Sequence, residues 1–183
     1  MHMDLTTTMP SLELGGHAPD FNLLGTDGKQ YSLSTFDDKK LLVLIFSSNG
    51  CPTVKACEDR MISIQKDYAA KSVQLLAINS NNEHLSPADA FDEMVQRSRD
   101  KGFNFPYAKD LDQSVARSYG AICTPHVFVL DKDRLLRYRG RIDDSRDASR
   151  VTSTDLRNTL EDLLEDGKVR VSETKPFGCS IVW

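Results

Sequence analysis

No apolar run in the 183-residue chain approaches the ~20 residues that a membrane-spanning helix requires. Residues 1–16 also lack the basic start and apolar centre of a secretory signal. The formal net charge is only −4, so the chain has no excess of positive charge with which to bind nucleic acid. We therefore expect a protein with neither a membrane nor a nucleic acid as partner. The expected location is the cytoplasm, or the periplasm if a signal segment has been removed.

Cysteine is scarce as well. Four cysteines are too few for a disulfide scaffold, and their positions do not show the paired spacing of a structural zinc site. The sequence therefore predicts no metal and no cofactor. A chain of this length fits a single domain and buries a sizeable core without cross-links. Each cysteine has to be judged by its own surroundings.

The apolar residues that are present alternate between strand and helix patterns. Residues 41–46 and 73–78 are unbroken apolar runs, which are typical of strands covered on both faces. Asp27-Gly28 between two short apolar segments predicts an N-terminal β-hairpin. The order of elements requires an α/β fold with a central mixed β-sheet and helices on both faces. The other expected elements are helices over 52–68, 87–101, 112–119 and 155–164, and a second hairpin over 126–130 and 135–141.

Cys51 holds the position best suited to a reactive thiol. It follows the run 41–46 and a four-residue link, and it precedes Pro52 at the start of a helical stretch. The first N–H groups of a helix have no intrahelical partner and carry the positive end of the helix dipole. Such a position lowers the pKa of a thiol, which is about 8.5 when free, and Lys55 one turn later would lower it further. Ser48 and Thr53 are candidates to hydrogen-bond the thiolate or a substrate.

The order of elements, with a cysteine after the first core strand and a Thr-Pro before the second hairpin, resembles the thioredoxin fold. It resembles more closely the redoxin branch, which contains alkyl hydroperoxide reductases, thiol-specific antioxidants and thioredoxin-like oxidoreductases. The resemblance places a redoxin domain at residues 16–166, between a flexible lead-in (1–15) and a C-terminal tail (167–183). The matching residues are Gly16-His-Ala-Pro-Asp-Phe21, Asp27-Gly28, Leu33, Leu42–Phe46, Cys51-Pro52, Tyr119-Gly120, Thr124-Pro125, Phe128, Asp131 and Arg139-Gly140.

Two departures separate the chain from the best-known members of that superfamily. Thioredoxins carry Cys-x-x-Cys, but here Val54 stands at the second position. Peroxiredoxins carry Pro-x-x-x-Thr/Ser-x-x-Cys, which Ser48 and Cys51 fit, but Leu44 stands at the proline position. The chain is similar to a subgroup of redoxin proteins with an Asn-x-Cys-Pro-x-Val-Lys pattern, a Cys-Thr-Pro and a Gly-Cys-Ser-Ile tail.

The resemblance implies that the Thr124–Pro125 bond is cis and that its loop faces Cys51. Thr124 and Pro125 would then bind the substrate, and the backbone edge at Thr124 would pair with an extended substrate segment. The same geometry would bring Cys123 near Cys51 as its partner thiol, unless Cys123 packs under the loop. Cys179 is the second candidate, in a tail that either supplies a resolving thiol or docks against the body.

The other candidates have plainer interpretations. Cys57 shares the apolar stripe of its helix and is expected in the core, because pairing with Cys51 would require the first turns to unwind. His126 begins a strand and is expected to be structural. Arg139 and Arg141 are expected at the solvated surface, although one of them could donate to a thiolate or a peroxide.

These residues support a thiol–disulfide oxidoreductase as the first hypothesis. Cys51 would attack a protein or small-molecule disulfide, and a thiol reductant such as thioredoxin or glutathione would restore the reduced form. The alternative is a thiol peroxidase, in which a peroxide converts Cys51 to a sulfenic acid. A Cu(I)-binding module built from Cys51, Cys123 and His126 is a weaker alternative, as is a non-catalytic interaction module. The sequence does not predict the oligomeric state.

Overall fold

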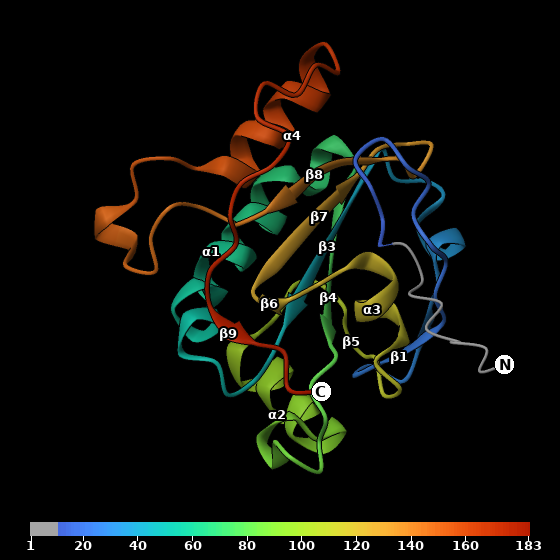
Figure 1. Cartoon of the computed structure of the whole chain (residues 1–183), viewed down its shortest axis with the longest axis vertical. Coiled ribbons are helices and arrows are strands. Elements are labelled where there is room, and N and C mark those ends of the chain that lie inside the picture. The colour runs from blue at the N-terminus through green and yellow to red at the C-terminus, as the bar shows by residue number, and fades with distance from the viewer. Residues whose placement is uncertain (1–10) are drawn as a thin grey trace, which may run out of the picture.

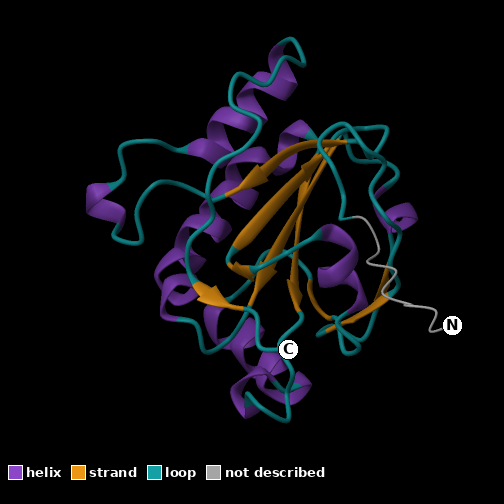
Figure 2. Ribbon diagram, in the orientation of Figure 1, coloured by secondary structure: helices purple, strands orange, loops and turns teal. Residues whose placement is uncertain are grey.

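The computed structural model describes residues 11–183, so most of the expected lead-in lies outside the described residues. In this range the chain forms a seven-stranded mixed sheet in the order β2-β1-β5-β4-β3-β7-β8, with helices on both sides (Figures 1 and 2). Its strands are β1 (Leu23–Gly25), β2 (Gln30–Tyr31), β3 (Leu41–Ser47), β4 (Val73–Asn79), β5 (Tyr107–Lys109), β7 (His126–Leu130) and β8 (Leu136–Gly140). The helices are α1 (Pro52–Tyr68), α2 (Phe91–Lys101), α3 (Ser114–Tyr119) and α4 (Asp155–Glu165).

Strand β3 lies at the centre of this sheet. It pairs in parallel with β4 on one side and antiparallel with β7 on the other, so that Leu44 stands between Leu76 and Phe128. Strand β5 continues the parallel part, whereas β1, β2 and β8 are antiparallel to their neighbours. The expected thioredoxin-like architecture, with its mixed sheet, flanking helices and N-terminal hairpin, is confirmed.

Two apolar clusters cover the two faces of the sheet. Val43 and Ile45 pack toward α1, α2 and α4, while Leu44 and Phe46 pack toward α3 and the segment before β1. Because side chains alternate along a strand, β3 needs apolar residues at every position to fill both clusters. The five residues from Leu42 to Phe46 are fully buried, which makes β3 a rigid support for the loop that follows it.

The sequence-based order is wrong in two places. It omits β5, whose three residues are too few to produce a recognisable pattern. It also begins a helix at Pro87, whereas residues Pro87–Asp89 form a separate 3-10 turn and α2 begins at Phe91. Within residues 11–183, no helix has the length and apolar character needed to cross a bilayer.

Both ends of the described chain are attached to the body. Leu12 is buried, and the N–H of Gly15 donates to the carbonyl oxygen of Leu136. At the other end, the tail (167–183) runs from α4 past the outer side of β8 and then beneath the sheet, as the red segment of Figure 1 shows. There β9 (Cys179–Ser180) pairs with β6 (Cys123–Thr124) in a separate two-stranded sheet. The tail thus brings a distant cysteine to the end of β3.

Candidate active site

Cys51 is the N-cap residue of α1, directly after the loop that leaves β3. Pro52 occupies the first helical position and has no N–H, so Thr53 and Val54 supply the first free donors of the helix. The N–H of Val54 donates to the sulfur of Cys51, and the N–H of Thr53 donates to the sulfur of Cys179. The helix N-terminus therefore gives one amide to each of two sulfur atoms.

The two sulfur atoms are in direct contact. The Sγ atoms of Cys51 and Cys179 lie 2.8 Å apart, and both cysteines are free thiols. Antiparallel pairing of β6 with β9 produces this contact, because it aligns Thr124 with Cys179 across the ladder. The sulfur of Cys51 also lies 3.3 Å from the carbonyl oxygen of Thr124.

The surroundings make the two thiols chemically unequal. Burial raises the pKa of Cys51, but hydrogen bonds from the Cys179 thiol, the Val54 N–H and the Thr124 hydroxyl lower it below the ordinary value. The pKa of Cys179 is raised to about 11, first by burial and then by its hydrogen bond to Cys51 and the charge there. Of the two thiols, Cys51 therefore loses its proton first, and Cys179 then donates the hydrogen bond between the sulfur atoms.

The structure places Cys179, and not Cys123, against Cys51, which reverses the expected order of the two candidates. Cys123 is 8% exposed, and its sulfur lies 3.9 Å from the carbonyl oxygen of Pro125. Side chains alternate along β6, so Cys123 points away from the face on which the Thr124 hydroxyl meets Ser48 at 3.3 Å. Burial raises the pKa of Cys123 to about 11.

The Thr124–Pro125 peptide bond is cis, as the resemblance implies. The backbone edge at Thr124, however, is not open to a substrate segment, because β9 of the chain's own tail is paired with it. Thr53 acts through its backbone, since its N–H reaches Cys179. Cys57 is buried in the cluster beneath α1 with its pKa raised by burial to about 11, as expected of a core residue.

Gly178 allows the tail to approach this edge so closely. A Cβ atom built on Gly178 would lie 2.0 Å from the carbonyl oxygen of Thr124, far inside van der Waals contact. Its φ of +149° is also a conformation that residues with side chains rarely adopt. The glycine of the Gly-Cys-Ser-Ile tail is therefore required by the position of Cys179.

A clamp of polar side chains, not foreseen from the sequence, holds the last residues of the tail. Asn81 accepts from the N–H of Val182 at 2.9 Å, and Gln113 donates to the carbonyl oxygen of Val182 at 2.8 Å. That carbonyl also accepts the N–H of Asn82 at 2.7 Å, while Ile181 is buried against the core. The run Asn79-Ser-Asn-Asn82 at the carboxyl end of a parallel strand was the available signal, because sites in α/β sheets gather there.

The clamp and the Cys51 loop share one buried carboxylate. Asp89 accepts from the backbone N–H of Asn49 at 2.7 Å, and its other oxygen accepts from the side chain of Asn81 at 3.0 Å. The pKa of Asp89 lies below its usual value, because these bonds and one from Ser86 outweigh the effect of burial. A single ionised group thus positions both the residue two before Cys51 and the residue that holds Val182.

The remaining candidates lie away from the sulfur pair or are engaged in structural contacts. The Nδ1 atom of His126 accepts the N–H of Ile122, and burial lowers its pKa to about 4, so the ring is neutral. Arg139 pairs with Glu173, and Arg141 pairs with Asp155. In the described part of the chain, no three His, Cys, Asp or Glu side chains are arranged to hold a metal ion. The copper site of the weaker alternative is therefore not formed by residues 11–183.

Comparisons with known proteins concern the family and the fold of this chain. The model of the Redoxin family matches residues 13–160. Thiol-disulfide oxidoreductase ResA of Bacillus thuringiensis is 29% identical over 130 residues, which cover 69% of each chain. A hypothetical protein from Sinorhizobium meliloti superposes with a TM-score of 0.89 at 36% identity, over 95% of this chain and 96% of that one. An uncharacterised conserved protein from Geobacillus kaustophilus superposes with a TM-score of 0.88 at 35% identity, over 97% of this chain and 94% of that one.

Proposed function

The chain belongs to the Redoxin family and is a thiol–disulfide oxidoreductase, and we propose that Cys51 is its attacking thiolate and Cys179 the second thiol of the exchange. The observation that carries this assignment is the 2.8 Å contact between the two sulfur atoms at the N-terminus of α1. The partners of such an enzyme are disulfides on one side and thiol reductants on the other. Thioredoxin and glutathione are the reductants that we propose.

The exchange takes two displacements. The Cys51 thiolate attacks one sulfur of the substrate disulfide, so that a Cys51–substrate disulfide forms and the other substrate sulfur leaves as a thiolate. Cys179 then loses its proton and attacks the sulfur of Cys51, which expels the second substrate thiolate. The substrate gains two electrons and two protons, and the enzyme retains a Cys51–Cys179 disulfide.

The contact between the two thiols also sets their order of action. The negative charge on Cys51 and its hydrogen bond contribute to the raised pKa of Cys179. Once Cys51 is consumed in the mixed disulfide, that charge is gone and Cys179 ionises more readily. Cys179 therefore becomes a nucleophile only after the first displacement.

The substrate has to replace the tail during the first displacement. Cys51 is 4% exposed while β9 lies on the Thr124 edge. We propose that an extended segment of the substrate takes the place of β9, pairs with Thr124 and brings its disulfide to the sulfur of Cys51. The return of β9 then delivers Cys179 for the second displacement.

Trapping with oxidised glutathione tests the assignment. Cys179→Ser should accumulate a stable Cys51–glutathione disulfide, whereas wild type and the matched control Cys123→Ser should proceed to a Cys51–Cys179 disulfide. Peptide mass spectrometry identifies each product. Closure of a Cys51–Cys123 disulfide in Cys179→Ser, or an adduct on a cysteine other than Cys51, would show that the assignment is wrong.

Peroxide reduction is a second candidate function. The Ser48-x-x-Cys51 spacing and the Thr124 hydroxyl beside the sulfur favour it. Peroxide would convert the Cys51 thiolate to a sulfenic acid, and Cys179 would displace water from it to form the same disulfide. Rates of disulfide formation with hydrogen peroxide and with oxidised glutathione, measured side by side, separate the two activities.

Two finer assignments complete the proposal. We place the chain in the redoxin subgroup that combines Asn-x-Cys-Pro-x-Val-Lys, Cys-Thr-Pro and the Gly-Cys-Ser-Ile tail, because these three segments converge on one site here. The cytoplasmic location stays a prediction from the sequence.

A further inference from the structure

The two sulfur atoms of the site differ in how far solvent reaches them. Cys51 is 4% exposed, whereas Cys179 is only partly buried, on a strand at the surface. The tail is held on both sides of Cys179. Before it, the backbone of Arg139 bonds to Ser172 and Thr174, and after it the polar clamp holds Val182. Once β9 has returned and the disulfide has closed, the tail therefore stays in place, and the sulfur that a reductant meets is that of Cys179.

Building on the proposed Cys51–Cys179 exchange, we propose that the reductant attacks Cys179, so that the mixed disulfide of the regeneration step forms on the tail. The reductant thiolate bonds to the sulfur of Cys179, the Cys51–Cys179 bond breaks, and its electron pair leaves on Cys51. A second thiol of the reductant then attacks the reductant's own sulfur in the mixed disulfide. Cys179 departs as a thiolate and takes a proton, and the reductant dithiol is oxidised by two electrons.

The stability of the departing thiolate also favours attack on Cys179 over attack on Cys51. Displacement at a disulfide is faster when the departing sulfur is the more stable thiolate. Cys51 departs into the hydrogen bonds of the Val54 N–H and the Thr124 hydroxyl, which are already in place. Attack on Cys51 would instead expel Cys179, whose bond from the Thr53 N–H does not offset its burial. Access and leaving-group stability thus select the same sulfur.

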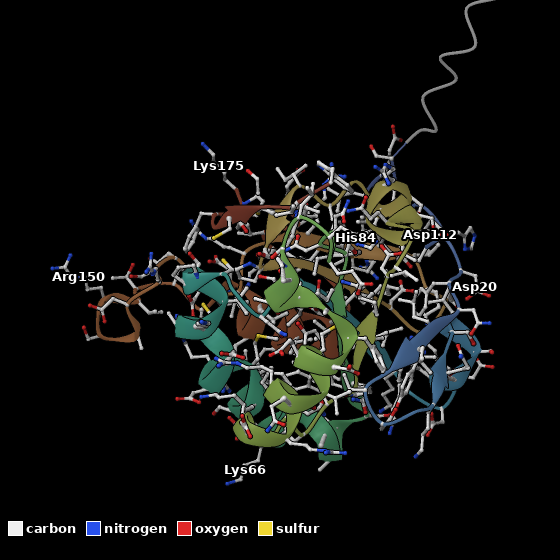
Figure 3. The ribbon with its side chains drawn as sticks, turned by 90° about the horizontal axis from the view of Figure 1, so that it is seen from below. Asp20, Lys66, His84, Asp112, Arg150 and Lys175 are labelled. Carbon is white, nitrogen blue, oxygen red and sulfur yellow. The ribbon has the colours of Figure 1, made fainter. Side chains whose placement is uncertain are left out.

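A cation near Cys179 also assists an anionic attacker. Arg146 lies on the exposed arm between β8 and α4, close enough to Cys179 for its charge to lower the pKa of that thiol. The arm is fixed in place by Arg60, which bonds to the carboxylate of Asp143 and to the carbonyl oxygens of Ser145 and Arg146. Arg150 lies at the far end of the same arm (Figure 3). The two arginines therefore provide a matched pair for testing.

The experiment traps the mixed disulfide formed during reduction. Purified protein carrying the Cys51–Cys179 disulfide is mixed with a reduced thioredoxin variant whose second active-site cysteine is replaced by serine, so that the mixed disulfide is not resolved. Excess N-ethylmaleimide, added after a short interval, captures the released thiolate before digestion for mass spectrometry. We expect at least tenfold more thioredoxin on Cys179, with the maleimide on Cys51. Equal or greater amounts of thioredoxin on Cys51 would overturn the inference and leave the proposed function intact. Failure to form the Cys51–Cys179 disulfide at all would overturn both.

The charge variants supply a second readout. At low ionic strength, Arg146→Glu should slow reduction of the disulfide by glutathione about threefold or more, while Arg150→Glu should have little effect. Equal rates in the two variants would contradict approach at Cys179.

Discussion

Replacing Gly178 with alanine should separate the two thiols without disturbing the body of the protein. The added Cβ would lie 2.0 Å from the carbonyl oxygen of Thr124, whereas ordinary contact requires more than 3 Å. Strand β9 must then move away from β6 by at least about 1 Å, the difference between those distances. That displacement breaks the 2.8 Å contact between Cys51 and Cys179.

The contacts that hold the tail in place determine how far the substitution shifts the equilibrium between dithiol and disulfide. Burial of Ile181 contributes about 1.5–3 kcal/mol, because its side chain is almost completely removed from water. The hydrogen bonds of Val182 to Asn81, Asn82 and Gln113 contribute about 1 kcal/mol each. Complete release of the tail would lose about 5 kcal/mol, equivalent to more than a thousandfold in the equilibrium constant for disulfide closure. Retention of the clamp with β9 alone displaced gives the lower limit, which we place at about tenfold.

Titration of the protein in glutathione buffers measures the change in the equilibrium constant for disulfide closure directly. We expect Gly178→Ala to favour the dithiol by at least about tenfold relative to wild type. Its thermal midpoint should stay within a few degrees when the clamp is retained, because both core clusters remain filled. Complete release of the tail would lower the midpoint by about 10–20 °C, at about 2–4 °C for each kcal/mol lost.

Gly167→Ala is the matched control. Gly167 lies in the same tail with a φ of +76°, but a Cβ there meets no atom within 4 Å. It therefore also places a side chain at a positive φ, but without the overlap on Thr124, and its dithiol–disulfide equilibrium should match wild type. A change below threefold in Gly178→Ala, or the same change in both variants, would refute the role given to Gly178.

Three further predictions follow from the contacts of the site. Cys123→Ala should close the Cys51–Cys179 disulfide at a rate within about twofold of wild type in a stopped alkylation assay, and a large loss would restore Cys123 as a partner. The pH midpoint for iodoacetamide alkylation of Cys51 should lie below that of a free thiol and rise in Cys179→Ala, which removes a hydrogen-bond donor to the thiolate. His126 has a folded-state pKa of about 4 against 6.5 for the free group, so the unfolded state binds more protons between these values. Its contribution, up to about 3 kcal/mol, is present above pH 6.5 and lost as the pH falls toward 4, and His126→Asn should flatten that part of the urea-unfolding profile.

The position of Cys51 could be predicted from the sequence because every determinant is local. An unbroken apolar run fixes a central strand, Pro52 marks the start of a helix, and the N–H groups of that helix reach a sulfur only one to three residues away. The same short-range patterns identified the hairpins and the mixed sheet. The sequence patterns did not identify strand β5, because its three residues form a strand only through their pairing with β4 and β1 on either side.

The partner thiol and the clamp could not be predicted in the same way. Whether Cys123 or Cys179 meets Cys51 depends on which face of β6 carries Thr124 and on where a distant tail crosses the sheet. Local sequence does not identify Asn81 and Gln113 as contacts of the tail, or Asp89 as the carboxylate that holds Asn81. Local patterns thus determined where Cys51 lies and that its sulfur meets the first amides of a helix. Only the tertiary structure decided which thiol lies against it, because contacts between segments far apart in the chain depend on the packing of the whole sheet and produce no periodic pattern in either segment.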